Sequence, residues 1–572
     1  MKSGNKVKEA PSIQGKLISV TGLVVTVVFW SQGTDPFNLP KLAILTLGAF
    51  ALLGSIFDIN LIRRVEKLPA ILTGIFILAL INSFIFSGAP QLQMFFGAYS
   101  RNTGFLDYFA LAVLFLGAAT LRQNSDFLRI QRFYFIALTL VIIVCILEIS
   151  GINIQRVNLT FKGSLIGTFG NPNFISAYLG MSGTAVFAVL LGWKKNLLQR
   201  AIFILPLVVI ALLILRSNSR QGIVVLIGGC AFVFFFYLRS LNKTKILQVL
   251  YLGVIGVVGV FSIAGALKKG PLAEVIYKNS VAFRGEYWSA GIEMFKSHPF
   301  AGVGLNSYGD WYRTLRSSSA IISPGPEVFT NTSHNIYIDY AAAGGLPLFA
   351  AFLAIVVLTL ISVVRFIKRN KEFDGVYFSF LGAWIVYLVQ GIISIDQIGL
   401  AVWGWILPGI LLAYERTNKN IHLNTESQLQ TLKSKKSKLA ENTLIEASIL
   451  IKILASIIVA LIIVIPVVKS DFDVRKAYDS TSAELLIAAA NQWPTNNYKV
   501  ANVTGLLINN NLGKESLELA NKGIKEYPRS YDLWKLIYFN SLAPAEQRKL
   551  ALKKMSELDP LNPNVLAELA KQ

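Results

Sequence analysis

Three arginines and one histidine stand in short polar segments between long apolar runs. Arg220 lies in a turn of about four residues, Arg284 opens a longer polar stretch, and Arg101 precedes another apolar run. His334 ends a polar cluster immediately before the next run. Guanidinium groups bind phosphate oxygens in pairs, and a neutral histidine accepts a proton at physiological pH. If they converge, these residues could hold a phosphate-bearing ligand and support transfer of a group from it.

Plainer explanations remain open for each of them. Arg101 and Arg220 also fit arginines that anchor helix ends at a membrane boundary. A lone histidine at a helix start is often an interfacial or capping residue. Asn173, in Gly170-Asn171-Pro172-Asn173, is expected to cap the next helix.

Two acidic segments also have candidate roles. Asp35, in Thr34-Asp35-Pro36-Phe37, is one of the few carboxylates in the short loops expected on the outer face of the membrane. Asp471 and Asp473 have the spacing of a pair that binds metal–nucleotide complexes. Because they begin a segment expected outside the cytoplasm, we interpret this pair as solvated charge or helix capping.

Composition identifies the class of protein. Of 572 residues, 54% are hydrophobic and only 15% are charged, which excludes a single soluble core, a disordered chain and a disulfide-stapled secreted domain. Cys145 and Cys230 lie inside apolar runs and are interpreted as packing residues. Three histidines are too few for a multi-histidine metal cluster, and no P-loop, HExxH or CxxC pair is present, so we expect neither a metal nor another cofactor.

The apolar runs predict an all-α, polytopic membrane protein with about twelve core transmembrane helices and one further helix. Each run is long enough to cross a bilayer. The runs lie at 17–34, 41–58, 69–87, 104–121, 133–150, 174–192, 201–217, 221–238, 246–266, 336–364, 376–395 and 398–414, with the further helix at 446–468.

Lysine and arginine cluster on alternate connecting segments, which predicts the orientation. The positive-inside rule then places residues 1–16 and a linker at 415–445 in the cytoplasm. The net charge of +22 is therefore largely a topology signal, and we expect no binding to nucleic acid.

Two larger polar pieces lie on the opposite, extracytoplasmic side. The first is a loop at 267–335, where Trp288, Ile292 and Phe295 predict an amphipathic helix on the membrane face. After it, the glycines of the segment 298–304 would allow close backbone approach. The second is a tail at 469–572, with prolines at intervals of 34 and 32 residues after helical runs. This layout resembles tetratricopeptide repeats, which usually bind a protein partner; an unrelated helical cap is the alternative.

Taken in order, the polar motifs resemble the O-antigen ligase and polymerase family over roughly residues 17–414. The motifs are Asp35-Pro36-Phe37 with Pro40-Lys41, Tyr99-Ser100-Arg101 with Gly104, Gly170-Asn171-Pro172-Asn173, Ser219-Arg220, Arg284 to Trp288, His298-Pro299-Phe300-Ala301-Gly302-Val303-Gly304, and His334-Asn335 before Gly345. A helical-repeat tail after the membrane core also occurs in this family.

The resemblance implies transfer of a glycan from undecaprenyl pyrophosphate to an acceptor hydroxyl, without metal or nucleotide and with inversion. It implies that Arg220 and Arg284 hold the pyrophosphate and that His334 acts on the acceptor hydroxyl. Asn335 would support His334.

Other positions carry less specific implications of the resemblance. Arg101 and Asn173 would shape the pocket, and Asp35 is either part of the substrate site or structural. The chain departs from the family at Ala343, where a Glu is frequent, and at Leu348, where a small residue is usual.

Several functions share these motifs. Ligation to lipid A core or a similar acceptor comes first, followed by repeat-unit polymerisation and by protein O-glycosylation, all at a bacterial cytoplasmic membrane. The alternative in which the protein catalyses no reaction is a transporter or flippase. It is less favoured because the unusual polar residues gather at one face, whereas transporters place charges near the bilayer midplane. A third alternative makes the tail a scaffold and the membrane part its anchor.

Overall fold

The computed structural model describes residues 11–56, 67–156, 163–193, 197–241, 245–276, 279–424, 439–480 and 482–571. Every regular element in these ranges is a helix, which confirms the predicted all-α fold. Part of the predicted cytoplasmic linker, at 425–438, lies outside the described residues, as do Lys2, Lys6 and Lys8 of the predicted cytoplasmic N-terminus.

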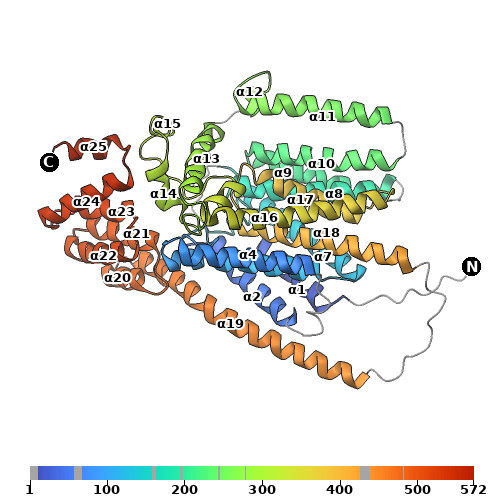
Figure 1. Ribbon diagram of the computed structural model, residues 1–572, viewed down its shortest axis with the longest axis horizontal. Coiled ribbons are helices and arrows are strands. Elements are labelled where there is room, and N and C mark those ends of the chain that lie inside the picture. Colours follow the sequence, from blue (N-terminus) through green and yellow to red (C-terminus); the bar gives the residue numbers. More distant parts are fainter. Residues whose placement is uncertain are drawn as a thin grey trace, which may run out of the picture.

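The long apolar runs form a bundle of roughly parallel and antiparallel helices (Figure 1). Within the described ranges, nine helices are long and apolar enough to cross a membrane, and four shorter apolar helices accompany them. Each of these coincides with one of the predicted runs, so the chain is a multi-pass membrane protein. The helices are α1 (Ile13–Val27), α2 (Asn38–Ile56), α4 (Lys67–Phe86), α6 (Phe105–Ala119), α7 (Asn124–Ile149), α8 (Pro172–Gly192), α9 (Leu197–Arg216), α10 (Arg220–Ser240), α11 (Lys245–Ala266), α16 (Ile336–Arg369), α17 (Gly375–Gln390), α18 (Ile398–Asn424) and α19 (Leu439–Ser480).

Burial differs strongly between these helices. In α18 the spanning window is 89% buried, and its Trp403 and Trp405 are among the core residues, whereas no residue of the α11 window is buried. Helix α11 lies along one edge of the bundle (Figure 1). Because its side chains are apolar on all sides, α11 is suited to lie in lipid.

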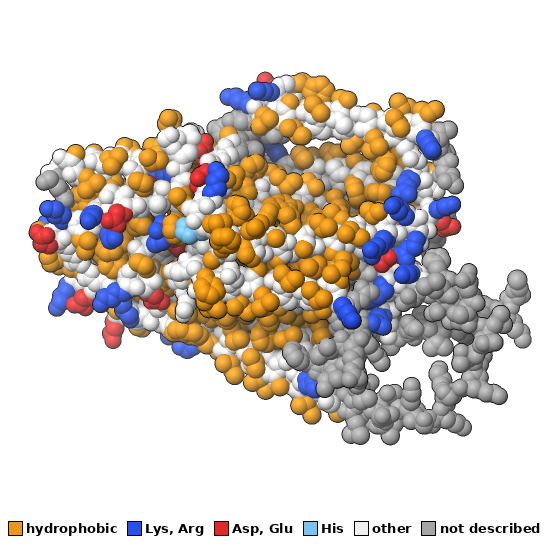
Figure 2. All heavy atoms as spheres, in the orientation of Figure 1, with side chains coloured by type: hydrophobic (Ala, Val, Ile, Leu, Met, Phe, Trp, Pro, Cys, Tyr) orange, Lys and Arg blue, Asp and Glu red, His pale blue; other side chains and the backbone are white. Residues whose placement is uncertain are grey.

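One end of the bundle carries the loop and the tail, and we call it the loop face. It holds α5 (Gln91–Phe96), α12 (Ala273–Ile276), α13 (Asn279–Ser297), α14 (Tyr308–Leu315) and α15 (Ser318–Ile322). Figure 2 shows a broad hydrophobic band on the bundle; Lys and Arg lie at the bundle end opposite the tail, and others lie on the tail together with Asp and Glu. That distribution matches the charge asymmetry of the sequence.

The tail is a stack of short helices with its own core. These are α20 (Ala483–Asn491), α21 (Asn497–Asn509), α22 (Gly513–Glu526), α23 (Tyr531–Phe539), α24 (Ala545–Leu558) and α25 (Pro563–Leu569). Consecutive helices pack against each other around Val503, Leu533 and Leu552. The tetratricopeptide assignment stays a prediction.

Helix α19 corrects one interpretation. It continues without a break to Ser480, past the end of the run predicted at 446–468. Asp471 is therefore inside a helix and buried, where it accepts hydrogen bonds from Thr34 and from the backbone N–H of Asp35. It is not solvated charge, because the loop between α1 and α2 covers it. Asp473 does lie at the surface, paired with Lys469.

Candidate active site at the loop face

The segment before α16 holds His334 in an unusual backbone conformation. His334 has φ of 58°, in the left-handed region that few residues other than glycine adopt. Its N–H donates to Thr332 Oγ1 at 3.1 Å. Strained conformations of this kind cluster at functional sites, where the surrounding structure holds them in place.

Two side chains of α16 hold that segment. Asn335 is the N-cap, and its Oδ1 accepts from the N–H groups of Tyr337 and Ile338 at 3.0 and 3.1 Å. The carboxylate of Asp339 accepts from Thr332 Oγ1 at 2.6 Å and from the N–H of Ser333 at 2.8 Å. Asn335 thus positions His334 through the backbone.

Helix α13 brings Arg284 and Tyr287 to the same place. This helix was predicted from the spacing of Trp288, Ile292 and Phe295, and its presence is confirmed. The ring centroids of Tyr287 and His334 are 5.7 Å apart.

Arg284 is a buried cation. It is only 8% exposed and forms no hydrogen bond or ion pair within the part of the chain that the structure describes. Burial lowers the pKa of its guanidinium, an effect that Tyr287 partly opposes. A buried charge without a partner is costly, so this position favours an anionic ligand.

Arg101 reaches the same segment from the loop between α5 and α6. Its Nε donates to Asn331 Oδ1 at 3.0 Å, three residues before His334. The sequence places Asn331 in the polar cluster but gives no sign that it holds an arginine.

The two arginines set the charge state of His334. Burial, together with the positive charges of Arg101 and Arg284, lowers the pKa of His334 to about 3. The imidazole is therefore neutral at physiological pH. A neutral imidazole close enough to two guanidinium groups to feel their charge can accept a hydrogen bond from a hydroxyl while the arginines bind an anion.

Arg220 is the first residue of α10, and this end of α10 lies beside the start of α8. The preceding Ser219 donates to Asn173 Oδ1 at 2.8 Å. Asn173 does not cap α8, because the N-cap is Asn171 and the first helical residue is Pro172. Pro fits the first helical position, where its missing N–H is not needed.

The turn after α17 links α10 to the His334 segment. Gln221 Nε2, next to Arg220, donates to Gln390 Oε1 at 3.2 Å, and the N–H of Ile336 donates to the Gly391 carbonyl at 2.8 Å. The starts of α10 and α16 therefore share one anchor, the turn after α17.

Asp35 and Lys41 have structural contacts instead. The Asp35 carboxylate accepts from the N–H groups of Phe37, Asn38 and Leu39, which start α2. Lys41 Nζ donates to three carbonyls at the end of α1, the nearest being Val28 O at 2.9 Å. In the described part of the chain, no hydrogen bond joins either residue to His334.

The glycine turn at 298–304 docks on a kink in α16. Gly345 interrupts α16 with φ of 65°, and there the N–H of Leu346 donates to the Pro299 carbonyl at 2.7 Å. Gly302 has φ of 68°, and a Cβ on it would lie 2.3 Å from the backbone of Ala343. The close approach expected of these glycines is confirmed.

We expect Gly302→Ala to destabilise the protein, because the methyl group meets backbone and the residue must keep a positive φ. The free energy of unfolding should fall by roughly 2 kcal/mol. The test is the Tm of purified protein, read by intrinsic tryptophan fluorescence. Gly74→Ala is the matched control, since a Cβ on Gly74 has no atom within 4 Å and its Tm should not fall. An unchanged Tm for Gly302→Ala would contradict this account of the turn.

A small cavity of about 50 Å³ lies beside Arg101. Asp339, Ala343 and Asp396 line it with Arg101. The Asp396 carboxylate accepts hydrogen bonds from the hydroxyl groups of Tyr340 and Tyr387, which tertiary packing brings to it. Within the described ranges, no three His, Cys, Asp or Glu side chains are close enough together to hold a metal ion.

Comparison with known proteins identifies part of this region. Residues 205–353 match the family model Wzy_C, described as O-antigen ligase. No curated protein matches the chain. The matched range contains Arg220, Arg284, His334 and Asn335, while Arg101, Asn173 and Asp35 precede it.

Proposed function

From the match of residues 205–353 to the O-antigen ligase family model, we propose that this membrane protein is a glycosyltransferase that uses a lipid-linked glycan. The donor is a glycan on undecaprenyl pyrophosphate, and the acceptor is a hydroxyl of lipid A core or a similar molecule. The observation that carries the proposal is the buried Arg284, which has no hydrogen-bond or ion-pair partner among the described residues, close to a neutral His334.

The site has the parts that such a transfer needs. The diphosphate of the donor is an anion that Arg284, Arg220 and Arg101 can bind, with stabilisation of the charge that grows on the leaving group. His334 accepts the proton of the acceptor hydroxyl as its oxygen attacks the anomeric carbon. The bond from that carbon to the diphosphate oxygen breaks, undecaprenyl pyrophosphate leaves, and the anomeric centre inverts.

This proposal extends to topology and to the remaining sites. The loop face is extracytoplasmic and the N-terminus is cytoplasmic, in a bacterial inner membrane. ATP is absent at the extracytoplasmic face, so the energy for transfer must already be stored in the pyrophosphate bond of the donor. Asn335 positions His334, while Asn173 shapes the pocket through Ser219.

The lipid-linked glycans of a deletion strain test the function. Loss of the gene should cause long glycans to accumulate on undecaprenyl pyrophosphate, and wild-type protein should reverse this while Arg284→Ala should not. Accumulation of single repeat units would instead identify a polymerase. An unchanged profile with intact surface glycans, in a strain without a second such gene, would reject glycan transfer and favour a transporter.

A further inference from the structure

The tail packs on the loop that carries Arg284. Asp559, at the end of α24, accepts from Arg316 Nη2 at 2.6 Å and from Arg313 Nη1 at 3.1 Å. The side chains of Asp559 and Arg316 are fully buried. Beside this pair, Arg529 of the tail lies over the ring of Trp311 at 3.5 Å. The contact is thus built from desolvated charges and an aromatic ring, unlike the loose contacts of a mobile appendage.

A short path leads from this ion pair to Arg284. Directly after Arg316, Ser317 donates its hydroxyl to the Glu286 carboxylate, and Ser319 donates to the same oxygen at 2.9 Å. Glu286 is two residues after Arg284 on α13. The segment held by Asp559 therefore also holds α13.

Aromatic packing provides a second path. The rings of Tyr312 in α14 and Tyr287 in α13 are 5.7 Å apart in an edge-on arrangement. Tyr308 also donates its hydroxyl to the Tyr287 carbonyl. Since Tyr287 is the residue that lies against His334, the position of α14 affects the surroundings of His334 as well as Arg284.

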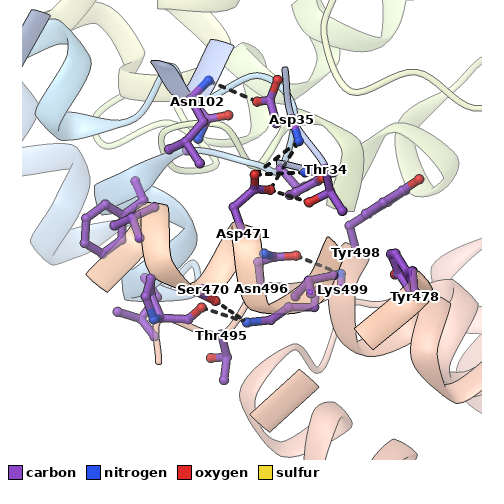
Figure 3. Close-up of a pocket in the computed structure, with 18 residues that line it drawn as sticks. Thr34, Asp35, Asn102, Ser470, Asp471, Tyr478, Thr495, Asn496, Tyr498 and Lys499 are labelled. Atoms are coloured by element: carbon purple, nitrogen blue, oxygen red, sulfur yellow. Dashed lines mark hydrogen bonds between the residues drawn. The ribbon is translucent and has the colours of Figure 1, made fainter. Parts of the chain in front are cut away.

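The other end of the tail contacts the loop that carries Arg101. Tyr498 stacks on Tyr99, with ring centroids 4.8 Å apart and planes within 5°. Figure 3 shows Asp471 directed toward Thr34 and Asp35, and Lys499 directed toward Ser470 on the same side. The tail thus contacts both loops that supply arginines to the His334 site.

We propose that the tail is an intramolecular clamp and that Asp559 is a positioning residue for Arg284, acting through Arg316 and the serines that hold Glu286. This inference rests on the proposed glycan transfer for its effect on rate. The clamp itself concerns only the placement of α13 and α14 and has a readout of its own.

The test uses full-length protein in lipid nanodiscs, with Asp559→Asn compared with Glu557→Gln. Both variants remove one carboxylate at the C-terminal end of α24, but Glu557 lies at the tail surface, where it pairs with Lys554. Hydrogen exchange in residues 284–319 should rise in Asp559→Asn and stay at the wild-type level in Glu557→Gln. Transfer from an undecaprenyl pyrophosphate glycan should fall about ten- to a hundred-fold in Asp559→Asn, since small misplacements of binding groups have effects of this size. The KM for the donor should rise while the KM for the acceptor stays unchanged.

A second variant covers the case in which Asp559→Asn unfolds the tail. Ser317→Ala with Ser319→Ala removes both hydroxyl contacts to Glu286 and leaves the Asp559 ion pairs in place. It should raise exchange in α13 but not in α24, again with a higher donor KM.

The outcomes separate the two proposals. The clamp would be overturned if hydrogen exchange in residues 284–319 stayed at the wild-type level in both Asp559→Asn and the double serine variant. It would also be overturned if exchange rose while the KM for the donor stayed unchanged. Raised exchange in a protein whose wild type transfers no glycan would support the clamp on α13 and reject glycan transfer.

Discussion

Replacing Arg284 with alanine is expected to reduce glycan transfer by roughly a thousand-fold, the effect typical of losing an arginine that stabilises a phosphoryl leaving group. Arg284 is buried, forms no ion pair in the described part of the chain, and lies on the helix that packs against His334. No nearby carboxylate has to be left unpaired by its removal. The loss should therefore appear in transfer and not in the amount of protein in the membrane.

Two further variants make this prediction specific. Arg284→Lys keeps the charge but loses the planar fork, and it should recover only part of the rate because a lysine cannot bind two phosphate oxygens in parallel. Lys296→Ala on the same helix is the control, since the Lys296 side chain is 63% exposed and pairs with Glu293 at the surface. The measurement is initial transfer rate with purified donor in proteoliposomes. A rate for Arg284→Ala within threefold of wild type would remove Arg284 from the mechanism.

The bundle could be predicted from the sequence because each spanning helix is a long apolar run. In lipid, the backbone N–H and C=O groups of such a run must form hydrogen bonds within the run itself, and a single segment can do this only as a helix. The loop helix was also predictable, since Trp288, Ile292 and Phe295 recur at helical spacing.

Capping at α8 was predicted at the wrong residue, although a signal was present. Both Asn171 and Asn173 are good caps, but Pro172 lies between them. Proline is favoured at the first helical position, so the residue before it is the cap. With Asn171 as the cap, the side chain of Asn173 is available to accept the hydrogen bond from Ser219.

The candidate site was predictable as a set of residue types but not as a geometry. Arg101 and Asn331 are far apart in the chain, and nothing in their local sequence shows that one binds the other. The same holds for Asp559 and Arg316, which become a fully buried pair only when the tail folds onto the loop. Asp471 looked solvated because its partners, Thr34 and Asp35, come from the other end of the chain.

We expect His334 to remain neutral throughout pH 5 to 8 in the protein without donor. Burial and the charges of Arg101 and Arg284 lower its pKa to about 3, so protonation would occur only as the pH falls toward that value. Tyr287 also packs against the imidazole, and the Asp339 carboxylate lies behind the segment without offsetting the arginines. A histidine with its ordinary pKa of about 6.5 would instead titrate in the middle of this range.

Binding of an anion should change this state. A diphosphate on Arg101 and Arg284 offsets the charges that disfavour the imidazolium, so it should raise the pKa of His334 and make the imidazole a better proton acceptor. The proton of the acceptor hydroxyl would then have a place to go only when the donor is bound. Such coupling would limit loss of the activated glycan to water.

Histidine NMR can follow this directly because the chain has only three histidines. The His334 signal is assigned with His334→Asn, a substitution that tolerates the left-handed φ of this position and should abolish transfer. Without ligand, the His334 signal should not titrate between pH 5 and 8; with inorganic pyrophosphate its pKa should move upward, and in Arg284→Ala pyrophosphate should move it less. A His334 that titrates near 6.5 in free protein, or a pKa unmoved by pyrophosphate in wild type, would mean that the arginines do not control it. The base would then have to be sought among the other groups at the loop face, beginning with Asp339 and Asp396.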